Sequence, residues 1–237
     1  MAELEAEAAA AGGEAPQSQL GRLEYWASVY SRELANFDAS EGEDNGVDWF
    51  SENVRGKLVK WLAAAECVDK DAAVLDVGCG NAQFLVELHD DADWRGRLVG
   101  VDYSGEAVEL ARKNTSLANV AGDFREATIQ DLSAHLEQRG ETASYGLVHD
   151  KGTFDAYMLA DGASLQVYAA AVLAALSPAG VFIVTSCNHT TAELQRYFTV
   201  DEPSFKTVDT IAYPTFCFGG VTGAAVATVA FKLAIKS

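Results

Sequence analysis

Short apolar runs alternate with amphipathic stretches along most of the chain from residue 72 onward. The apolar runs are rich in β-branched residues, which favour strands, and the amphipathic stretches repeat their apolar positions every three or four residues, as helices do. The pattern predicts strands over 73–78, 97–104, 124–131, 145–151 and 180–187, and helices over 83–90, 105–118 and 164–177. Two last strands are expected over 205–214 and 225–235, with no long helix between them.

Two further helices are predicted before the first strand, over 20–37 and 48–65. In the second helix, apolar residues recur at steps of three and four and form one stripe, which consists of Phe50, Val54, Leu58, Trp61 and Leu62. We expect both helices to form a cap on the sheet, over residues 20–65. The acidic, turn-rich stretch 38–47 between them is expected to be a connecting loop.

Strands that alternate with helices imply a parallel sheet whose two faces are covered by right-handed crossovers. The last two strands lack a long connecting helix, so we expect antiparallel pairing there. The fold class predicted for residues 20–237 is one α/β domain with a Rossmann-like, mostly parallel seven-strand sheet, an antiparallel closing strand and helices on both faces. A chain of 237 residues is long enough for one such core and short for two.

Residues 1–19 consist mainly of alanine, glutamate and glycine, with almost no large apolar side chain. Such a segment cannot bury enough surface to order itself, and we expect it to be a disordered acidic tail. It lacks the basic start and apolar centre of a secretion signal, and no apolar run of the chain approaches the roughly 18–20 residues that cross a bilayer. We therefore expect a monomeric protein of the cytosol or the nucleus that does not bind membranes.

The net charge is −18 at pH 7, and four glutamates of the tail leave −14 for the rest of the chain. Nucleic-acid binding needs clustered lysine and arginine, so this charge argues against a nucleic-acid partner. It favours a basic protein partner through long-range attraction, although solubility alone would also explain it. The four cysteines show no C-x-x-C spacing, so we expect neither a metal site nor a disulfide framework.

A glycine-rich loop, in LDVGCGNAQFL (75–85), follows the first predicted strand. Open α/β sheets bind ligands at the carboxyl ends of their strands, and glycine lets a backbone approach a ligand closely. The dinucleotide fingerprint G-x-G-x-x-G needs a glycine where the chain has Gln83. The pattern of S-adenosylmethionine-binding loops is an acid followed by three glycines at alternate positions, and the chain matches it with Asp76, Gly78, Gly80 and Ala82. The loop therefore favours S-adenosylmethionine over NAD.

Acidic residues end the next two predicted strands. Asp102, in GVDYS, can accept hydrogen bonds from two ribose hydroxyls, and hydrogen bonds to a carboxylate are stronger than neutral ones. NAD enzymes place an acid similarly, so Asp102 indicates an adenosine ligand without choosing the cofactor. Asp131 can accept from an adenine amino group or cap the helix that begins at LSAHL, and the two roles are compatible.

Three later motifs are harder to explain as scaffold: VHDKGTFDAYML (148–159), TSCN (185–188) and FCFGG (216–220). With the WF pair at 49–50, LDVGCGN and GVDYS, they resemble the class I, seven-strand protein-lysine methyltransferases from about Trp49 to Phe231. The D-K-G-T-F-D-A string carries the resemblance to the lysine-modifying family, because LDVGCG alone is common to the whole superfamily. The departures are Ala82 for the usual glycine, which bears on cofactor affinity, and the longer acidic connector, which bears on substrate docking.

The resemblance implies that the cofactor is S-adenosylmethionine and that the substrate is a lysine of translation elongation factor 1-alpha, a basic protein that suits the −14 charge. A lysine amine with a pKa near 10.4 must lose its proton and be aimed at the methyl group. Burial beside aromatic rings lowers that pKa, and the candidate walls are Phe154, Tyr157, Phe216 and Phe218.

Asp150 can orient the amine or accept its proton through water, and Asn188 is a polar candidate at the mouth of the site. We therefore assign the catalytic roles to Asp150, Phe154, Asn188 and Phe218. The expected cofactor-binding residues are Trp26, Asp76, Gly78, Gly80, Asn81, Asp102, Tyr103, Gln130, Asp131 and Asp150. Each of the aromatic candidates, Trp26 included, also fits ordinary core packing.

Three functions remain open at the level of sequence. The favoured one is a protein-lysine methyltransferase. The second is a small-molecule N- or O-methyltransferase, which predicts a deep closed pocket and turnover without a protein substrate. The third is a non-catalytic member that binds the cofactor as an interaction module, and the presence of Asp76, Asp102 and Asp150 argues against it. An NAD oxidoreductase is disfavoured by Gln83 and by the lack of a Tyr-x-x-x-Lys pair.

Overall fold

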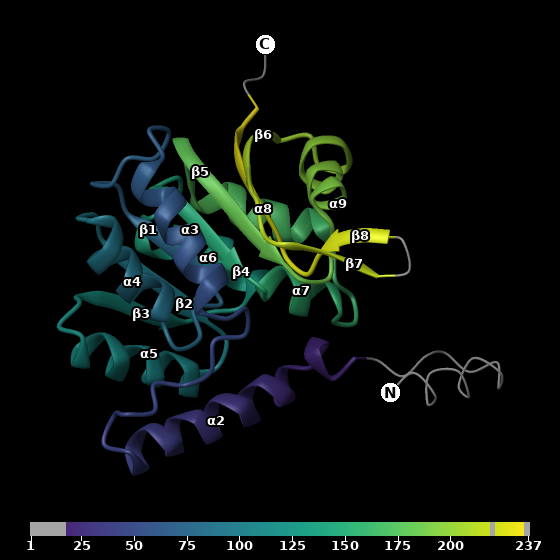
Figure 1. The fold of residues 1–237 in the computed structure, drawn as a ribbon. Helices are drawn as coiled ribbons and strands as arrows, with labels where there is room; N and C mark the ends of the chain where they lie inside the picture. Colours follow the sequence, from purple (N-terminus) through teal and green to yellow (C-terminus); the bar gives the residue numbers. More distant parts are fainter. Residues whose placement is uncertain (1–17, 219–220, 235–237) are drawn as a thin grey trace.

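The computed structural model describes residues 18–218 and 221–234, and its centre is a seven-stranded sheet in the order β3-β2-β1-β4-β5-β9-β6 (Figure 1). The strands of this sheet are β1 Val74–Val77, β2 Leu98–Asp102, β3 Gly122–Glu126, β4 Tyr145–Lys151, β5 Leu176–Ser186, β6 Phe205–Ile211 and β9 Ala227–Leu233. Strands β1 to β5 pair in parallel, whereas β9 runs antiparallel to both β5 and β6. The predicted mostly parallel sheet with an antiparallel closing strand is confirmed.

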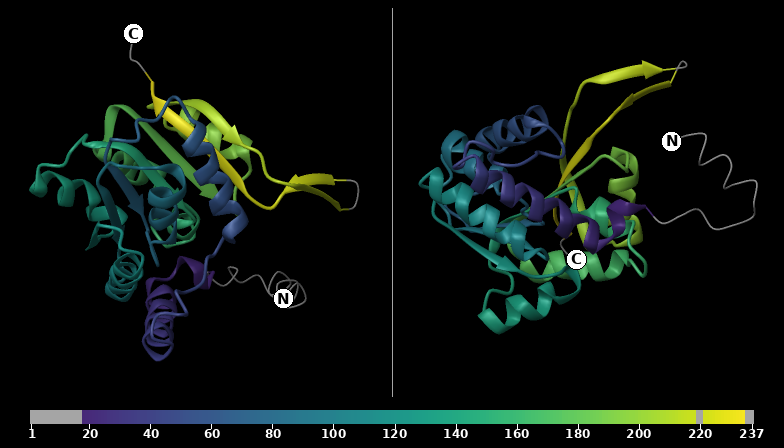
Figure 2. Two further views of the ribbon diagram at one scale, coloured as in Figure 1. Left: turned by 60° about the vertical axis from the view of Figure 1, so that its left-hand side comes forward. Right: turned by 90° about the horizontal axis from the view of Figure 1, so that it is seen from below.

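Helices cover both faces of this sheet, as predicted (Figures 1 and 2). The α-helices are α2 Leu23–Ala39, α3 Glu52–Ala64, α4 Gln83–Ala92, α5 Gly105–Leu117, α6 Ile129–Arg139, α7 Thr153–Met158, α8 Leu165–Ala175 and α9 Thr191–Arg196. One apolar core joins α6, α7, α8 and α9 to the sheet, and a second joins α3, α4 and α5 to the opposite face. Helix α2 packs on α5 (Figure 1).

Neighbouring residues of a strand point to opposite faces of a sheet, and β4 shows the consequence for the site. Val148 packs in the core under α8, whereas Leu147 packs in the core under α4. His149 and Lys151 therefore share the face of Leu147, and Asp150 shares the face of Val148. This alternation decides which of the last β4 residues reach the cavity described below.

Several predicted boundaries were wrong. The third strand ends at Glu126 rather than at 131, because the Thr128 side chain accepts a hydrogen bond from the Asp131 N–H and begins helix α6. Gln130 and Asp131 thus lie in the first turn of a helix. The strand expected from residue 180 begins at Leu176, which pairs with Tyr145.

Four elements were not predicted: α7, which directly follows β4, α9, the π-helical turn η2 over Tyr197–Asp201, and a hairpin formed by β7 Thr215–Phe218 and β8 Val221–Ala224. Figure 2 shows this hairpin projecting from the body of the molecule. At the other end of the chain, most of the predicted tail 1–19 lies outside the described residues. Gln19 already belongs to a 3₁₀ turn, η1 Gln19–Gly21, which precedes α2.

Candidate active site

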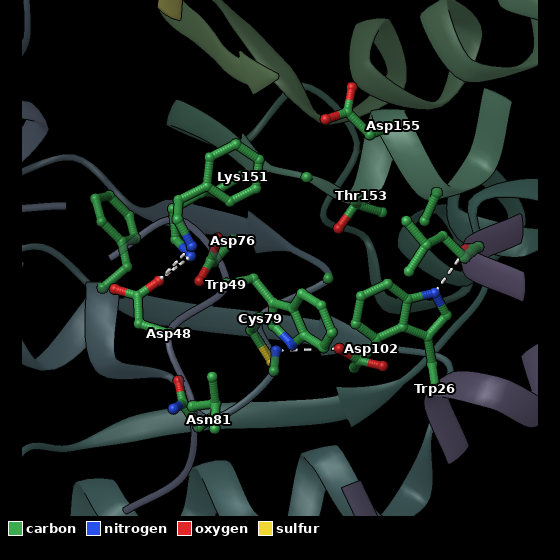
Figure 3. A pocket seen from close by; sticks show the side chains of 18 of the residues that line it. Trp26, Asp48, Trp49, Asp76, Cys79, Asn81, Asp102, Lys151, Thr153 and Asp155 are labelled. Atoms are coloured by element: carbon green, nitrogen blue, oxygen red, sulfur yellow. Dashed lines mark hydrogen bonds and ion pairs between the residues drawn. The ribbon is translucent and has the colours of Figure 1, made fainter. Parts of the chain in front are cut away.

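Two adjoining cavities open at the carboxyl ends of the parallel strands. The first, here called the central cavity, has a volume of about 150 Å³ and lies at the ends of β1 and β4 (Figure 3). The second, the side cavity, has a volume of about 340 Å³ and lies at the ends of β2 and β3. Residues that line both cavities are Leu20, Trp26, Gly78, Asp102, Tyr103, Thr153 and Ala156. The cavities therefore form one elongated site, as expected at the edge of an open α/β sheet.

The glycine loop after β1 forms the floor of the central cavity, and its glycines cannot be replaced without a clash. Gly78 has a φ of +70°, and a Cβ there would lie 1.7 Å from the Thr153 Oγ1. Gly80 has a φ of +50°, and a Cβ there would lie 2.4 Å from the Tyr30 hydroxyl. Ala82 also has a positive φ, +59°, at the start of α4, so the residue that departs from the glycine pattern sits in a conformation that glycine favours.

Asp102 ends β2 and lines both cavities with a side chain that is 5% exposed. Its Oδ2 accepts a hydrogen bond from the Gly80 N–H at 3.0 Å (Figure 3), and its Oδ1 accepts one from the Ser104 N–H at 3.0 Å. Burial raises the pKa of Asp102 to about 6, and these two hydrogen bonds oppose the rise. The carboxylate is thus fixed by the backbone, and lone pairs remain for ribose hydroxyls.

Asp76, the acid of the glycine-loop pattern, pairs with His149 of β4, the neighbouring strand in the sheet. Its Oδ1 is 2.7 Å from the Nδ1 of His149, the residue opposite it in β4. The His149 ring is fully buried and stacks on Phe84, with ring centroids 3.7 Å apart. This pairing holds the Asp76 carboxylate at the wall of the central cavity.

The connector between α2 and α3 covers the central cavity and is not a free surface loop. The Asn45 carbonyl accepts hydrogen bonds from the side-chain amides of Asn81 and Asn114, at 3.2 Å and 3.0 Å. The Trp49 ring meets the Trp26 ring edge-on, with centroids 4.6 Å apart. These contacts place the connector over the glycine loop.

A buried cluster of ion pairs joins the connector to β4 and α3 at the central cavity. The Lys151 Nζ lies 2.9 Å from the Asp48 Oδ1 (Figure 3), and Asp48 also pairs with Arg55. Burial would raise the pKa of Asp48, but Lys151 and Arg55 outweigh it and lower that pKa. Both cations line the central cavity, so they are the candidates to face an anionic group of a ligand there.

Most of the predicted cofactor residues line one or both cavities. Those in the central cavity are Trp26, Asp76, Gly78, Gly80, Asn81, Asp102 and Tyr103, and Gln130 lines the side cavity. Asp131 lines neither, because it is exposed on α6 and its carboxylate accepts a hydrogen bond from the Thr128 hydroxyl. The predicted N-cap role of Asp131 was wrong, because Thr128 is the N-cap and its hydroxyl accepts a hydrogen bond from the Asp131 N–H. The adenine contact stays a prediction.

The predicted catalytic residues separate into three groups. Asn188 lines the central cavity. Asp150 and Phe154 do not: both are 0% exposed, and Asp150 accepts hydrogen bonds from the Tyr168 hydroxyl at 2.6 Å and the Phe154 N–H at 3.1 Å. Alternation along β4 turns Asp150 toward α8, and the Phe154 ring packs among the rings of the core there. The Phe218 side chain lies outside the described residues.

The sequence analysis missed several residues that line the central cavity. They are Tyr30, Asp48, Trp49, Phe50, Lys151, Thr153, Asp155 and Cys187. Lys151, Thr153 and Asp155 belong to the DKGTFDA motif, and the period of two in β4 was the signal that assigns Lys151, rather than Asp150, to the cavity. Trp49 belongs to the WF pair of the resemblance, although no role was assigned to it. Asp48 had no local signal, because its position depends on its ion pair with Lys151 of β4.

Replacement of Asp150 by asparagine is expected to remove a pH dependence of stability. Burial raises the pKa of Asp150 to about 7, against the opposing hydrogen bond from Tyr168. Because the unfolded value is about 3.9, the contribution of this carboxyl to stability is fully present below about pH 4 and is lost as the pH rises through about 7. Between pH 5 and pH 8, denaturant unfolding should show the wild type losing stability relative to Asp150→Asn, by up to ~1.4 kcal/mol per pH unit. Parallel losses in both proteins would contradict this assignment.

The site fits S-adenosylmethionine by the chemistry of its residues. The glycine cradle leaves space that a Cβ would fill, and Asp102 offers a buried carboxylate for ribose hydroxyls. Asp76 can face an ammonium group, Lys151 or Arg55 a carboxylate, and Trp26 and Trp49 an apolar surface. Within 18–218 and 221–234, no three His, Cys, Asp or Glu residues form a group able to hold a metal ion, and none of the helices is long and apolar enough to cross a membrane.

This strand order, with a glycine loop after the first strand and an acid after the second, defines the class I S-adenosylmethionine-dependent methyltransferases. Residues 68–220 match a family described as a methyltransferase domain. A TehB-like methyltransferase from Corynebacterium glutamicum shares the fold with a TM-score of 0.56 at 15% identity, over 88% of this chain and 98% of that one. A methyltransferase from Aquifex aeolicus has a TM-score of 0.53 at 13% identity, over 75% and 88% of the two chains.

Closer relatives specify the family within this class. The protein-lysine N-methyltransferase EFM4 of Saccharomyces cerevisiae is 37% identical over 90% of this chain and 94% of its own length. The EEF1A lysine methyltransferase 2 of Homo sapiens is 33% identical over 91% of this chain and 87% of its own length, and that of Danio rerio is 36% identical over 91% and 88%. The chain belongs to this family of protein-lysine N-methyltransferases.

Proposed function

We propose that the chain transfers a methyl group from S-adenosylmethionine to a lysine side chain of translation elongation factor 1-alpha, as a monomer in the cytosol or the nucleus. The observation that carries the proposal is similarity along about nine-tenths of the chain to the EEF1A lysine methyltransferases 2 of zebrafish and human. The net charge of −18 supports it, because a basic substrate protein is attracted to an acidic enzyme.

The charges of the central cavity favour cationic groups. Its lining contains four carboxylates, those of Asp48, Asp76, Asp102 and Asp155, against the two cations Lys151 and Arg55. When bound, S-adenosylmethionine supplies a methyl group that its sulfonium has already activated, so no metal or covalent enzyme intermediate is required. The lining attracts both the sulfonium and the lysine ammonium.

The lysine must then lose its proton, because only the neutral amine has a lone pair for the methyl group. Aromatic side chains line the central cavity, among them Trp26, Trp49 and Phe50, and they exclude water from an amine that enters beside them. Desolvation disfavours the charged form of an amine and lowers its pKa. Asn188 is a neutral polar side chain of the lining that can accept a hydrogen bond from the amine and orient it.

The proposal is tested by incubating the enzyme with radiolabelled S-adenosylmethionine and purified elongation factor 1-alpha, and separately with a cell lysate. We expect label in the purified factor, and one labelled band of the same size in the lysate. Label confined to small molecules would instead indicate a small-molecule N- or O-methyltransferase. Cofactor binding without any transfer would indicate an interaction module.

A further inference from the structure

The carboxylate of Asp155 accepts hydrogen bonds from one turn of the chain. Asp155 lies in the first turn of α7 and is 5% exposed. Its Oδ1 accepts a hydrogen bond from the Ser186 hydroxyl and lies 3.2 Å from the His189 Nδ1, and its Oδ2 accepts one from the Cys187 N–H at 2.8 Å. All three partners belong to residues 186–189, here called the β5 turn, which begins at the last residue of β5.

The Ser186 hydroxyl holds the β5 turn together through three hydrogen bonds. The Ser186 Oγ donates to Asp155 and accepts hydrogen bonds from the N–H groups of Asn188, at 3.2 Å, and His189, at 2.9 Å. The hydroxyl therefore connects the carboxylate to the backbone of the next residues. Removing the carboxylate would leave Ser186 and the Cys187 N–H without their acceptor in a buried position, which is costly.

Cys187 and Asn188 line the central cavity from this turn, and Asp155 lines it from α7. Among the residues that the structure describes, the Asn188 side chain makes one hydrogen bond, a weak one that its Oδ1 accepts from the Cys187 thiol at 3.8 Å. Its position is therefore determined by the backbone of the β5 turn, and that backbone is held by Asp155. Figure 3 places Asp155 away from Asp102 and Asn81, beyond Thr153, at the end of the cavity remote from the ribose position.

The carboxylates in the lining differ in their ion-pair partners. Asp48 is balanced by Lys151 and Arg55. Asp155 has no lysine or arginine partner among the described residues and pairs with His189, as Asp76 pairs with His149. Burial would raise the pKa of Asp155, but the hydrogen bonds from His189, Ser186 and the Cys187 N–H outweigh it and lower that pKa. The group stays ionised and keeps accepting the three hydrogen bonds at neutral pH.

We propose that Asp155 is a positioning residue of the methyl-transfer reaction: it holds the β5 turn so that the Asn188 amide faces the incoming lysine amine. The Asn188 Oδ1 accepts a hydrogen bond from the amine, and the nitrogen lone pair is left pointing away from that bond. This assignment rests on the proposed function for its substrate, but the ordering of the turn does not.

The kinetic test compares Asp155→Asn, Asn188→Ala and the double variant, with elongation factor 1-alpha as substrate. Asparagine keeps the size of the side chain but places an N–H₂ group against one of the turn's donors. Misplacement of a group that orients a reactant can cost about 100-fold in rate, so we expect kcat/KM for the protein substrate to fall about 10- to 100-fold. The Kd for S-adenosylmethionine, measured by calorimetry, should rise much less than kcat/KM falls, because three of the four carboxylates in the lining, Asp102 among them, are unchanged. A general loss of folding would weaken cofactor binding as well.

The double variant decides between positioning and an independent effect. If Asp155 acts through Asn188, adding Asn188→Ala to Asp155→Asn should cause little further loss. Additive losses, or a Kd for the cofactor that rises as much as kcat/KM falls, would overturn the proposal. Asp91→Asn, which removes one exposed carboxylate on α4, is the matched control for charge. Ser186→Ala, which removes one of the three donors, gives a second and milder variant if Asp155→Asn folds poorly.

A measurement without substrate separates this inference from the proposed function. Amide hydrogen exchange of residues 187–189 should be faster in Asp155→Asn than in the wild type, and unchanged in Asp91→Asn. Unchanged exchange in Asp155→Asn would overturn the positioning role whatever the substrate is. Failure of the wild type to methylate elongation factor 1-alpha would overturn the proposed function alone.

Discussion

Replacement of Asp102 by asparagine should weaken the binding of S-adenosylmethionine about 100-fold. The carboxylate lies at the junction of the two cavities and accepts hydrogen bonds from Gly80 and Ser104. A hydrogen bond to a charged group contributes about 1.5–3 kcal/mol, and each 1.4 kcal/mol is a factor of ten in affinity. Asparagine offers one acceptor atom and no charge, so it cannot serve the glycine loop, Ser104 and two ribose hydroxyls together.

The measurement is the Kd from titration calorimetry, with Asp131→Asn as the matched control. Asp131 is an aspartate of the same region of the sequence, but it is exposed and lines neither cavity. Its replacement should leave the Kd unchanged within about twofold. A similar loss in both variants would mean that the adenine end of the ligand reaches α6. An unchanged Kd in Asp102→Asn would show that Asp102 does not bind the ribose hydroxyls.

The pH dependence of cofactor affinity follows from the same residue. Burial raises the pKa of Asp102 to about 6, and only the ionised carboxylate accepts hydrogen bonds at both oxygens. Protonation at lower pH therefore competes with the ligand, and affinity should fall about tenfold from pH 7 to pH 5. Asp102→Asn has no proton to bind at this position and should show a flatter profile over the same range.

How much of this site the sequence predicts depends on the range of the interactions involved. The strands, the glycine loop and Asp102 were predicted because apolar period, glycine conformation and strand ends are local properties. Asp150 was assigned to the cavity because it ends a strand, and the alternation of side chains along β4 turns it to the other face. On the face of β4 opposite to Asp150, Lys151 lines the central cavity with the glycine loop.

The covering of the site could not be predicted, because it is made by residues far apart in sequence. The connector after α2 has the composition of a loop, yet its Asn45 carbonyl is held by Asn81 and Asn114. Its Asp48 is paired with Lys151, which is 103 residues further along the chain. Neither partner leaves a periodic or compositional signal near residues 45–48, so only the folded chain shows that this segment belongs to the site.

Substitution of Gly78 by alanine, compared with Gly140 by alanine, separates backbone strain from the shape of the cavity. Both glycines have nearly the same backbone angle, with φ of +70° and +69°. A Cβ at Gly140 meets no atom within 4 Å, whereas a Cβ at Gly78 would lie 1.7 Å from the Thr153 Oγ1. The two substitutions thus share the cost of a left-handed alanine, which is about 1–2 kcal/mol, and differ in the clash.

We expect Gly140→Ala to lower the free energy of unfolding by about 1–2 kcal/mol and to leave the Kd for S-adenosylmethionine unchanged. Gly78→Ala should lower the free energy of unfolding further and weaken binding of S-adenosylmethionine more than ~10-fold. The reason is that Thr153 lines both cavities and would be displaced from its 2.9 Å hydrogen bond to the Val77 carbonyl. Denaturant unfolding and calorimetry measure the two effects separately. Equal stability losses with an unchanged Kd in both variants would show that the glycine at 78 serves only the backbone angle. A loss of binding confined to Gly78→Ala would show that the absence of a side chain there shapes the cofactor site.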